Sequence, residues 1–461
     1  MIIIPANSTS GAFEIANSCR FDNGDTSYLS RTAGTPTNSK KFTFSAWVKK
    51  SNDKSGGHYL LDTAATSVGS ENAIAFDGDQ KFRVGEYTGS NVFNTRTTAL
   101  FRDCASWYHC FIKGDSTQST ASDRVKIYVN GSLQNVDNEY PSENYDFKFN
   151  VSGNAINIGR GISNSGRILD GYLAEYYFID GEALAHTEFG EFDEDSPTIW
   201  KPKKFSGSFG SNGFHLDFKD SSALGNDVSG NNNDFTSNNL AAIDQSIDTP
   251  TNNFVTWNPL DTGRTYTGTI DLTQGNLRQS NGSDASLIST IAVNSGKWYM
   301  EFKCEDADNT RTFGIIDITE SNRYVGHSSV ASAVSYGYKS SDGTLWIGTS
   351  SQASSVGTTS AGDIVSIALD LDSATNSIKW QKNGSDLSGT TELSLTNHNT
   401  GYYWGIICRC DGGQVVSANF GSPAYAISSG NADANGYGNF EYAVPDGYLA
   451  LCTKNLGSDG G

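Results

Sequence analysis

The stretch Lys41-Phe-Thr-Phe-Ser-Ala-Trp-Val48 places apolar side chains at every second position. This period of two is typical of a β-strand with one face in a hydrophobic core. Runs of the same kind recur along the chain, and only residues 181–192 have spacing that suits a helix. The sequence therefore predicts a protein built mostly of strands. The further predicted strands are residues 107–113, 125–131, 169–179, 297–303, 312–318, 335–338, 363–370, 378–384, 402–410 and 414–420.

The composition agrees with an all-β fold. Of 461 residues, 49 are Gly and 9 are Pro, 11% are aromatic and 18% are charged. The aromatic content argues against disorder, and the low charge argues against coiled coils or long solvated helices. Asn130-Gly131 and Asn383-Gly384 each end a predicted strand, as expected of tight hairpins whose two turn residues have positive φ.

The charge of the chain excludes several classes of partner. Its 32 basic and 51 acidic residues give −19, so nucleic acid and anionic lipid would be repelled. No apolar run approaches the roughly 18 residues of a membrane span, and residues 1–5 lack the features of a secretion signal. We expect the seven cysteines to be small buried hydrophobic residues in a reducing compartment. They are Cys19, Cys104, Cys110, Cys304, Cys408, Cys410 and Cys452.

Residues 195–262 differ in composition from their surroundings. They hold four of the nine prolines among many Ser, Asn and Gly, together with enough aromatic residues to pack on a neighbouring domain. The predicted organisation is an N-terminal attachment segment (1–11), a first sandwich (12–194), a packed connector (195–262) and a second sandwich (263–461).

Two families resemble the two halves. The order Phe21–Leu29, Phe42–Val48, Trp107-Tyr-His and Lys126–Gly131, followed by Gly171–Glu175, resembles a laminin-G or concanavalin A-like jelly roll. The later order Gly296–Phe302, Gly362–Asp372, Lys379–Gly384, Asn419-Phe-Gly and Pro445–Tyr448 is similar to a SPRY domain. The resemblance implies two antiparallel β-sandwiches.

The connector carries a third resemblance. Residues 200–220, followed by Asn226–Phe235, resemble a segment of large structural proteins of marine bacteriophages. That resemblance implies a virion protein, a fibre, spike or decoration protein, assembled in the host bacterial cytoplasm. It would bind a host surface glycan or neighbouring virion proteins without being an enzyme. Fibres and spikes of phages are commonly trimers, so we expect a compact homotrimer.

The alternative is a glycoside hydrolase on the same jelly roll. Laminarinase-type glucanases place three acidic residues at alternate positions of one strand, and Glu191, Asp193 and Asp195 have that spacing. The third residue here is Asp rather than Glu, and the run lies beside Ser196-Pro197 after the last predicted strand. A solvated acidic turn is the preferred interpretation.

Calcium is the one cofactor that the sequence suggests. Oxygen-bearing side chains are dense around Gly230, but the terminal bidentate Glu of an EF-hand is absent, and Asx-turns use the same residues. A second, weaker candidate lies in the turn at 77–79, where a rim site of the jelly roll would fit. The candidate ligands are Asp227, Ser229, Asn231, Asn233 and Asp234, and Asp77 and Asp79.

Glycan recognition requires an exposed aromatic face with amides and carboxylates around it. We place it on loops of the SPRY-like half, with Tyr324 as the expected surface aromatic; Trp346 and Trp404 also fit a hydrophobic core. The candidate residues are Arg323, Tyr324, His327, Trp346, Trp404 and Asp411.

Overall fold

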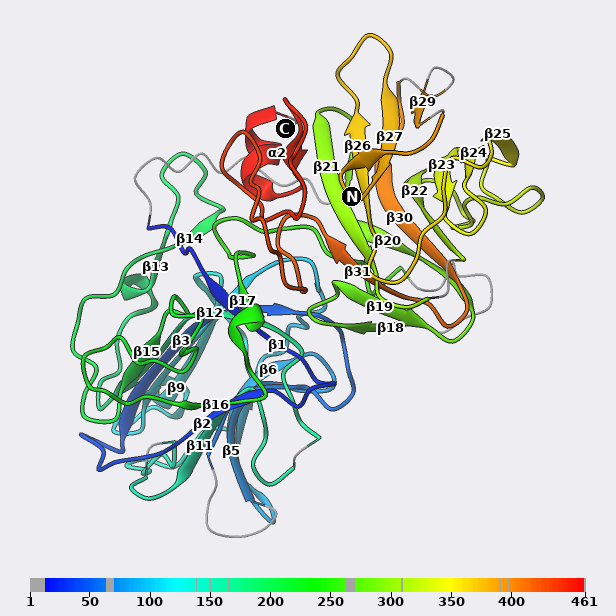
Figure 1. The fold of residues 1–461 in the computed structure, drawn as a ribbon. Coiled ribbons are helices and arrows are strands. Elements are labelled where there is room, and N and C mark those ends of the chain that lie inside the picture. Colours follow the sequence, from blue (N-terminus) through cyan, green and yellow to red (C-terminus); the bar gives the residue numbers. More distant parts are fainter. Residues whose placement is uncertain are drawn as a thin grey trace. The chain divides into compact units, whose positions relative to one another are not determined.

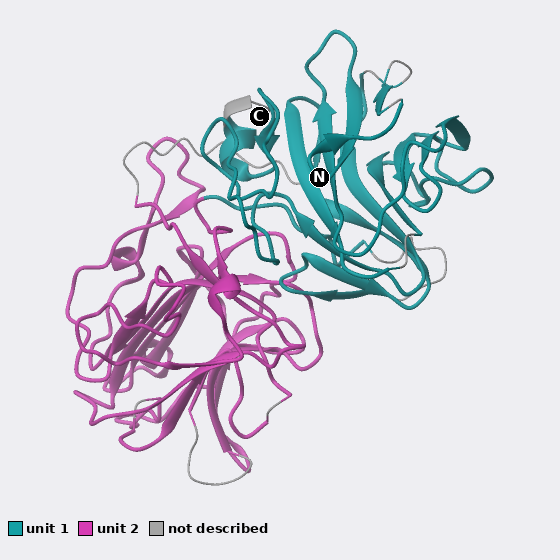
Figure 2. Cartoon of the chain, viewed as in Figure 1, with its two compact units in different colours: residues 1–8, 252–461 teal, residues 9–251 magenta. Residues whose placement is uncertain are grey.

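A computed structural model describes residues 13–63, 70–137, 139–149, 151–164, 166–261, 270–307, 310–389, 391–395, 398 and 400–459. The chain forms two compact units (Figure 2): residues 9–251, called the first unit here, and residues 252–461 with 1–8, called the second unit. The predicted attachment segment, residues 1–11, lies outside the described residues.

The first unit contains two large antiparallel sheets (Figure 1). The eight-stranded sheet has the order β10-β9-β8-β3-β12-β1-β17, with β15 also paired to β12. Its strands are β10 (Ser132–Leu133), β9 (Val125–Val129), β8 (Tyr108–Asp115), β3 (Lys41–Lys50), β12 (Gly171–Asp180), β1 (Ser18–Phe21), β17 (Gln245–Ser246) and β15 (Phe214–Leu216).

The seven-stranded sheet of the first unit has the order β16-β2-β11-β4-β5-β6-β7. Its strands are β16 (Thr236–Asn238), β2 (Tyr28–Thr32), β11 (Ala155–Ile158), β4 (His58–Thr63), β5 (Ser70–Phe76), β6 (Phe82–Thr88) and β7 (Asn91–Arg96). A separate hairpin pairs β13 (Gly190–Phe192) with β14 (Trp200–Pro202).

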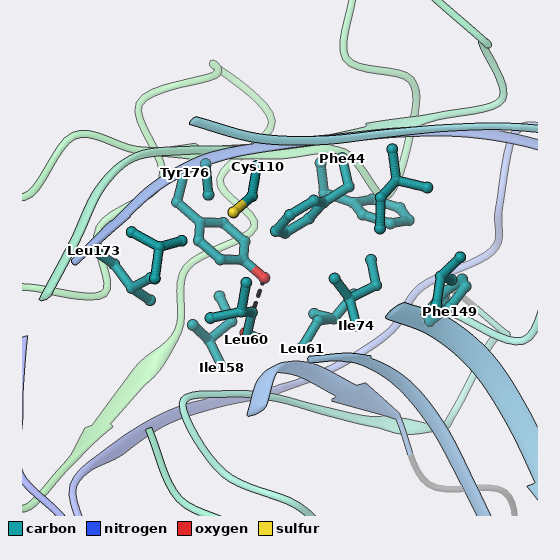
Figure 3. Close-up of a cluster of buried hydrophobic side chains, with 14 of the residues drawn as sticks. Phe44, Leu60, Leu61, Ile74, Cys110, Phe149, Ile158, Leu173 and Tyr176 are labelled. Atoms are coloured by element: carbon teal, nitrogen blue, oxygen red, sulfur yellow. Dashed lines mark hydrogen bonds between the residues drawn. The ribbon is translucent and has the colours of Figure 1, made fainter. Parts of the chain in front are cut away.

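The core of the first unit lies between its two sheets. Phe44 and Tyr176 from one sheet point toward Leu60 and Ile74 from the other (Figure 3). The Tyr176 hydroxyl donates a 3.0 Å hydrogen bond to the Leu60 carbonyl oxygen, which satisfies the one polar group that this tyrosine brings into the core. The apolar residues that alternate along the predicted strands are therefore the ones that meet between the two sheets.

The outer face of the eight-stranded sheet is also covered. Trp200 packs on Trp47 and Tyr172, and Phe205 packs with Tyr177, so β3 and β12 are buried on both sides. On the seven-stranded sheet, side chains of β5, β6 and β7 on the face opposite the core, among them Glu71, Tyr87 and Arg96, line an open groove.

The second unit is also a two-sheet antiparallel structure. Its nine-stranded sheet has the order β18-β19-β31-β21-β26-β27-β28, with β29 on β27 and β32 on β21, and its six-stranded sheet has the order β20-β30-β22-β23-β24-β25. The larger sheet holds β18 (Ile270–Thr273), β19 (Arg278–Asn281), β31 (Val415–Asn419), β21 (Lys297–Cys304), β26 (Ile364–Asp370), β27 (Ser377–Lys382), β28 (Ser385–Asp386), β29 (Glu392–Ser394) and β32 (Leu449–Ala450). The smaller holds β20 (Asp284–Val293), β30 (Trp404–Asp411), β22 (Arg311–Asp317), β23 (Ser335–Lys339), β24 (Thr344–Ile347) and β25 (Ser350–Ala353).

The all-β prediction is confirmed, and every strand predicted above has a counterpart in the structure. Both Asn-Gly turns are also confirmed: φ is 48° and 73° at Asn130 and Gly131, and 51° and 72° at Asn383 and Gly384. All seven cysteines fall in the described part of the chain, and each is buried with a free thiol.

The helical spacing of residues 181–192 was misleading. That segment holds only the 3-10 turn η1 (His186–Glu188) and strand β13, because its apolar residues pack on the outer face of a sheet rather than along one helix face. Elsewhere the described chain has three more short helical segments, α1 (Ala121–Arg124), η2 (Ala242–Asp244) and α2 (Thr453–Asp459). Within the described ranges no helix is long and apolar enough to cross a membrane.

The structure divides the predicted connector of residues 195–262 differently. Residues up to 251 group with the first unit because β15, β16 and β17 extend its two sheets. The remaining described residues, 252–261, group with the second unit, where Val255 and Trp257 enter its core.

Candidate functional site

The outer face of the seven-stranded sheet carries a cleft of about 870 Å³. Along β5 and β6 the core residues Ile74, Phe76, Phe82 and Val84 alternate with residues of the opposite face, and that face lines the cleft. The loop between β11 and β12 forms another wall. The lining residues are Ser55, Gly56, Tyr59, Glu71, Asp77, Gly78, Asp79, Arg83, Glu86, Tyr87, Asn91, Phe93, Asn94, Arg96, Ser163, Asn164, Gly166 and Arg167.

Small residues underlie the middle of this face. Ala73 of β5 is opposite Gly85 of β6, which is in turn opposite Asn94 of β7. A Cβ atom at Gly85 would come within 2.9 Å of the Asn94 Oδ1 atom and 3.0 Å of a backbone oxygen. Glycine is therefore required at position 85 for this close approach of β6 and β7.

Glu71 is the centre of a charged network in the cleft. Its Oε1 atom accepts a 2.6 Å hydrogen bond from Arg83 Nη2, and Oε2 accepts one of 2.9 Å from the Tyr59 hydroxyl. The Arg167 Nη1 atom donates to both Glu71 and Tyr59. One carboxylate thus holds two guanidinium groups, and burial raises the pKa of Tyr59 so that its hydroxyl stays protonated.

Arg83 extends this network to a second carboxylate. Its Nε atom donates a 2.6 Å hydrogen bond to Asp77 Oδ1. Burial by itself would lower the pKa of Arg83, but Tyr59, Asp77 and Glu71 outweigh burial and raise the pKa. Arg96 then pairs with Asp77, at 3.4 Å from Nη1 to Oδ2, and with Asp79.

At the other end of the cleft the lining is aromatic and amide-rich. Tyr87 is 39% exposed, and Asn91 beside it is also exposed. The Asn94 Oδ1 atom is buried without a hydrogen-bond partner within the described chain. An exposed ring next to amide groups is the combination that binds a sugar through one face and its hydroxyl groups.

Sequence reasoning missed this site except for Asp77 and Asp79, which were predicted as calcium ligands. Their carboxylates instead contact Arg83 and Arg96. The period-two pattern of β5 to β7 was the available signal, because it leaves Glu71, Arg83 and Arg96 on the face opposite the core.

The other predicted calcium loop has its carboxylate oxygens hydrogen-bonded to the chain. Asp227 Oδ1 accepts from the backbone N–H groups of His215 and Ser229, and its Oδ2 atom accepts from the Asn233 N–H and the Ser229 hydroxyl. Asp234 accepts from the Asp227 N–H, and the Asn231 amide donates to carbonyl oxygens. These are the contacts of Asx-turns. The described residues contain no group of three or more His, Cys, Asp or Glu side chains placed to hold a metal ion.

The glycan residues predicted in the second unit fall into two groups. Tyr324, His327 and Asp411 come together: the ring centroids of Tyr324 and His327 are 5.4 Å apart, and Arg409 lies over the Tyr324 ring and 3.2 Å from Asp411. Tyr324 is only 5% exposed, however, because its hydroxyl donates to Asp284 and its ring packs under Arg409. The prediction of an exposed Tyr324 was wrong.

The remaining members of that set lie elsewhere. Arg323 is buried, 3.1 Å from Asp261, with its guanidinium donating to backbone carbonyl oxygens. Trp404 is 2% exposed and contacts Tyr336 in the interior. Trp346 is half-buried on β24, opposite Gly337. The six residues therefore do not form one site.

The acidic run 191–195 lies away from the cleft. Glu191 belongs to β13, which pairs only with β14, and Asp193 caps the following turn by accepting hydrogen bonds from the N–H groups of Asp195 and Ser196. Lys201 is 3.7 Å from Glu191 and 3.5 Å from Asp193. This is the geometry of a solvated turn.

Comparison with known proteins agrees with the first unit's fold. Residues 22–188 match a laminin G family described as the concanavalin A-like lectin/glucanases superfamily. All residues that line the cleft, from Ser55 to Arg167, lie within this matched segment. No curated protein sequence matches the chain.

Several solved structures are similar to parts of the chain. The SPRY domain of human HERC1 is 14% identical, with a TM-score of 0.28 over 35% of this chain and 96% of that one. A heptameric SAP-like pentraxin from Limulus polyphemus is 18% identical, with a TM-score of 0.29 over 38% and 80%. A candidate carbohydrate binding protein from Bacteroides ovatus is 17% identical, with a TM-score of 0.35 over 49% and 59%.

Proposed function

We propose that the first unit binds carbohydrate in the cleft over β4 to β7, and that it does so without cleaving the glycan. The observation that carries this proposal is the cleft itself, a concave polar surface on a concanavalin A-like sandwich with an exposed tyrosine at one end. Binding sites for small polar ligands combine concavity with a few fixed hydrogen-bonding groups, and the Glu71 network provides such groups.

The arrangement of the carboxylates favours binding over hydrolysis. A glycosidase needs one carboxyl group to protonate the leaving oxygen and a second to act as nucleophile or base. On β5 the alternate positions of the cleft face are Glu71, Ala73 and Ala75, so this strand lacks alternating carboxylates, and the nearby Asp77 and Asp79 are paired with Arg83 and Arg96. Both carboxylate oxygens of Glu71 also already accept hydrogen bonds within the chain, one from Arg83 and the other from Tyr59 and Arg167.

The wider role is that of a phage virion protein, a fibre, spike or decoration protein that attaches to host glycan or to neighbouring virion proteins. The resemblance of residues 200–235 to marine phage structural proteins supports this role. The excess of acidic residues, which disfavours nucleic acid and anionic lipid as ligands, is compatible with it. Assembly in the bacterial cytoplasm follows from this proposal, and the seven free thiols suit a reducing compartment.

Substitution of Tyr87 tests the binding site. We expect Tyr87→Ala to weaken glycan binding at least tenfold, about 1.4 kcal/mol, because the exposed ring supplies the stacking surface. Binding would be measured on a glycan array and then by calorimetry with the glycans that bind. The matched control is Tyr403→Ala, since Tyr403 is exposed to a similar extent, 38%, on the second unit.

The outcome of this pair decides where recognition lies. Loss of binding in Tyr403→Ala with retention in Tyr87→Ala would contradict glycan binding in the cleft and would place recognition on the second unit.

Two further experiments test the other parts of the proposal. Release of reducing ends from a bound glycan by the purified protein would contradict the non-enzymatic proposal. Labelling of purified phage particles with an antibody against this chain tests the virion role, and unlabelled particles would contradict it.

A further inference from the structure

We infer that the cleft selects uncharged glycans over acidic ones, and that Glu71 is the residue that sets this preference. The inference rests on the proposed function, since it concerns the class of glycan that the same cleft takes. It is carried by the way in which charge is paired within the cleft.

The charged side chains of the cleft are balanced and paired. Three carboxylates, those of Glu71, Asp77 and Asp79, lie with the three guanidinium groups of Arg83, Arg96 and Arg167. Each of these arginines contacts a carboxylate. An acidic sugar entering the cleft would therefore meet no uncompensated cation in its described lining. A fourth acidic lining residue, Glu86, has its carboxylate on the core face of β6, where it accepts a hydrogen bond from the Tyr145 hydroxyl.

Carboxylates and guanidinium groups that are paired with each other can still form hydrogen bonds with the hydroxyl groups of a sugar. A carboxylate has about four acceptor positions and a guanidinium five N–H groups, so a pair that shares one or two hydrogen bonds keeps further capacity. Neutral sugars both donate and accept through their hydroxyl groups, and they lose little on leaving water compared with a carboxylate. A uronic acid would have to give up the hydration of its charge where each guanidinium group of the lining is already paired with a carboxylate and the half-exposed carboxylate of Asp79 is close by.

Glu71 neutralises the guanidinium group that is most accessible to a ligand. The Arg167 side chain is 36% exposed, whereas that of Arg83 is 7% exposed. Without the Glu71 charge, Arg83 would keep its ion pair with Asp77 at 2.6 Å, but Arg167 would keep only the neutral Tyr59 hydroxyl among its described partners. Glu71→Gln therefore creates an unpaired cation at the wall of the cleft, the group that binds carboxylates best in proteins.

The test compares glycans that differ only in charge. Calorimetry would use oligomers of equal length and linkage in which the C6 position is a hydroxymethyl group or a carboxylate: mannan and mannuronate, galactan and galacturonate, glucan and glucuronate. The wild-type chain is expected to bind the neutral member of a pair at least tenfold more tightly. Glu71→Gln is expected to reduce this ratio at least tenfold.

Two further variants separate this role from a structural one. In the double variant Glu71→Gln/Arg167→Gln the unpaired cation is gone, so the neutral preference is expected to return. Glu191→Gln removes an exposed carboxylate from the same unit outside the cleft and is expected to leave the ratio unchanged. A melting temperature for each variant verifies that the first unit remains folded.

Tighter wild-type binding of the acidic members would overturn the inference, as would an unchanged ratio in Glu71→Gln. Failure of the double variant to restore the neutral preference would overturn the assignment to Arg167 pairing. If the wild-type chain binds neither member of any pair and no glycan on an array, the proposed function itself fails, and this inference fails with it.

Discussion

His109 illustrates what a single residue contributes to the first unit. Its imidazole is 1% exposed, with Nε2 2.8 Å from the Ser45 hydroxyl and Nδ1 3.0 Å from the Trp200 Nε1 atom. An indole N–H can only donate, so the Nδ1 atom of His109 accepts the hydrogen bond from Trp200. The proton of the neutral imidazole is therefore on Nε2, which donates a hydrogen bond to the Ser45 hydroxyl oxygen. Burial, with a smaller contribution from His186, lowers the pKa of His109 to about 3. His109 therefore has a structural role, which agrees with its position in a strand among apolar residues.

This geometry predicts a pH dependence of stability. The unfolded chain binds a proton at His109 below about pH 6.5, whereas the folded chain does not, so the stability is fully present above pH 6.5 and is lost as the pH falls toward 3. The stability lost between pH 7 and pH 5 through His109 is about 2 kcal/mol. Urea unfolding at pH 7 and pH 5 would measure it. His109→Gln, which does not titrate, should lose correspondingly less stability over this interval, and equal losses would contradict the assignment.

Among the elements, the short strands after residue 195 matter most. β15 pairs with β12 and β16 pairs with β2, so segments distant in sequence complete both sheets of the first unit. Phe214 is 1% exposed and lies 4.8 Å from Phe235, between ring centroids, in the main core. Most of the residues expected to connect two domains, 195–251, are thus part of the first unit.

Fragments test this division. A fragment of residues 9–251 should be soluble and unfold cooperatively, whereas residues 9–194 should aggregate or lack a cooperative transition. The shorter fragment loses four strands, β14 to β17, and exposes core surface, where a single large apolar side chain is worth about 3–5 kcal/mol. Circular dichroism and thermal melting of both fragments would measure this. A shorter fragment as stable as the longer one would contradict it.

At the scale of the whole molecule, the prediction is a compact homotrimer, as expected for a phage fibre or spike component. Sedimentation equilibrium should give a mass about three times the 49.5 kDa of one chain. Repeating the measurement across a range of concentrations provides the control, because a specific trimer dissociates by mass action. A mass near one chain at all concentrations would contradict the prediction.

The sequence by itself determined the features that depend on neighbouring residues. The alternation in 41–48 determines which side chains of β3 face the core, and Asn130-Gly131 determines a hairpin because only a few residue types accept positive φ at both positions. The all-β class and the eleven predicted strands followed from such local patterns, but no strand of the seven-stranded sheet was among them. The same local patterns could not distinguish an exposed Tyr324 from a buried one, since its cover comes from Arg409, 85 residues away.

Only the tertiary structure determined the candidate site. Glu71, Arg83 and Arg167 become neighbours through the register of β5 with β6 and through a loop about 100 residues further along the chain. Their pairing also changes their chemistry, because a carboxylate that a sequence offers to calcium is already neutralised when a guanidinium lies 2.6 Å away, as at Asp77. Coulombic interactions and hydrogen bonds act over a few ångströms in space regardless of separation along the chain, so the charge of this cleft is set by the fold.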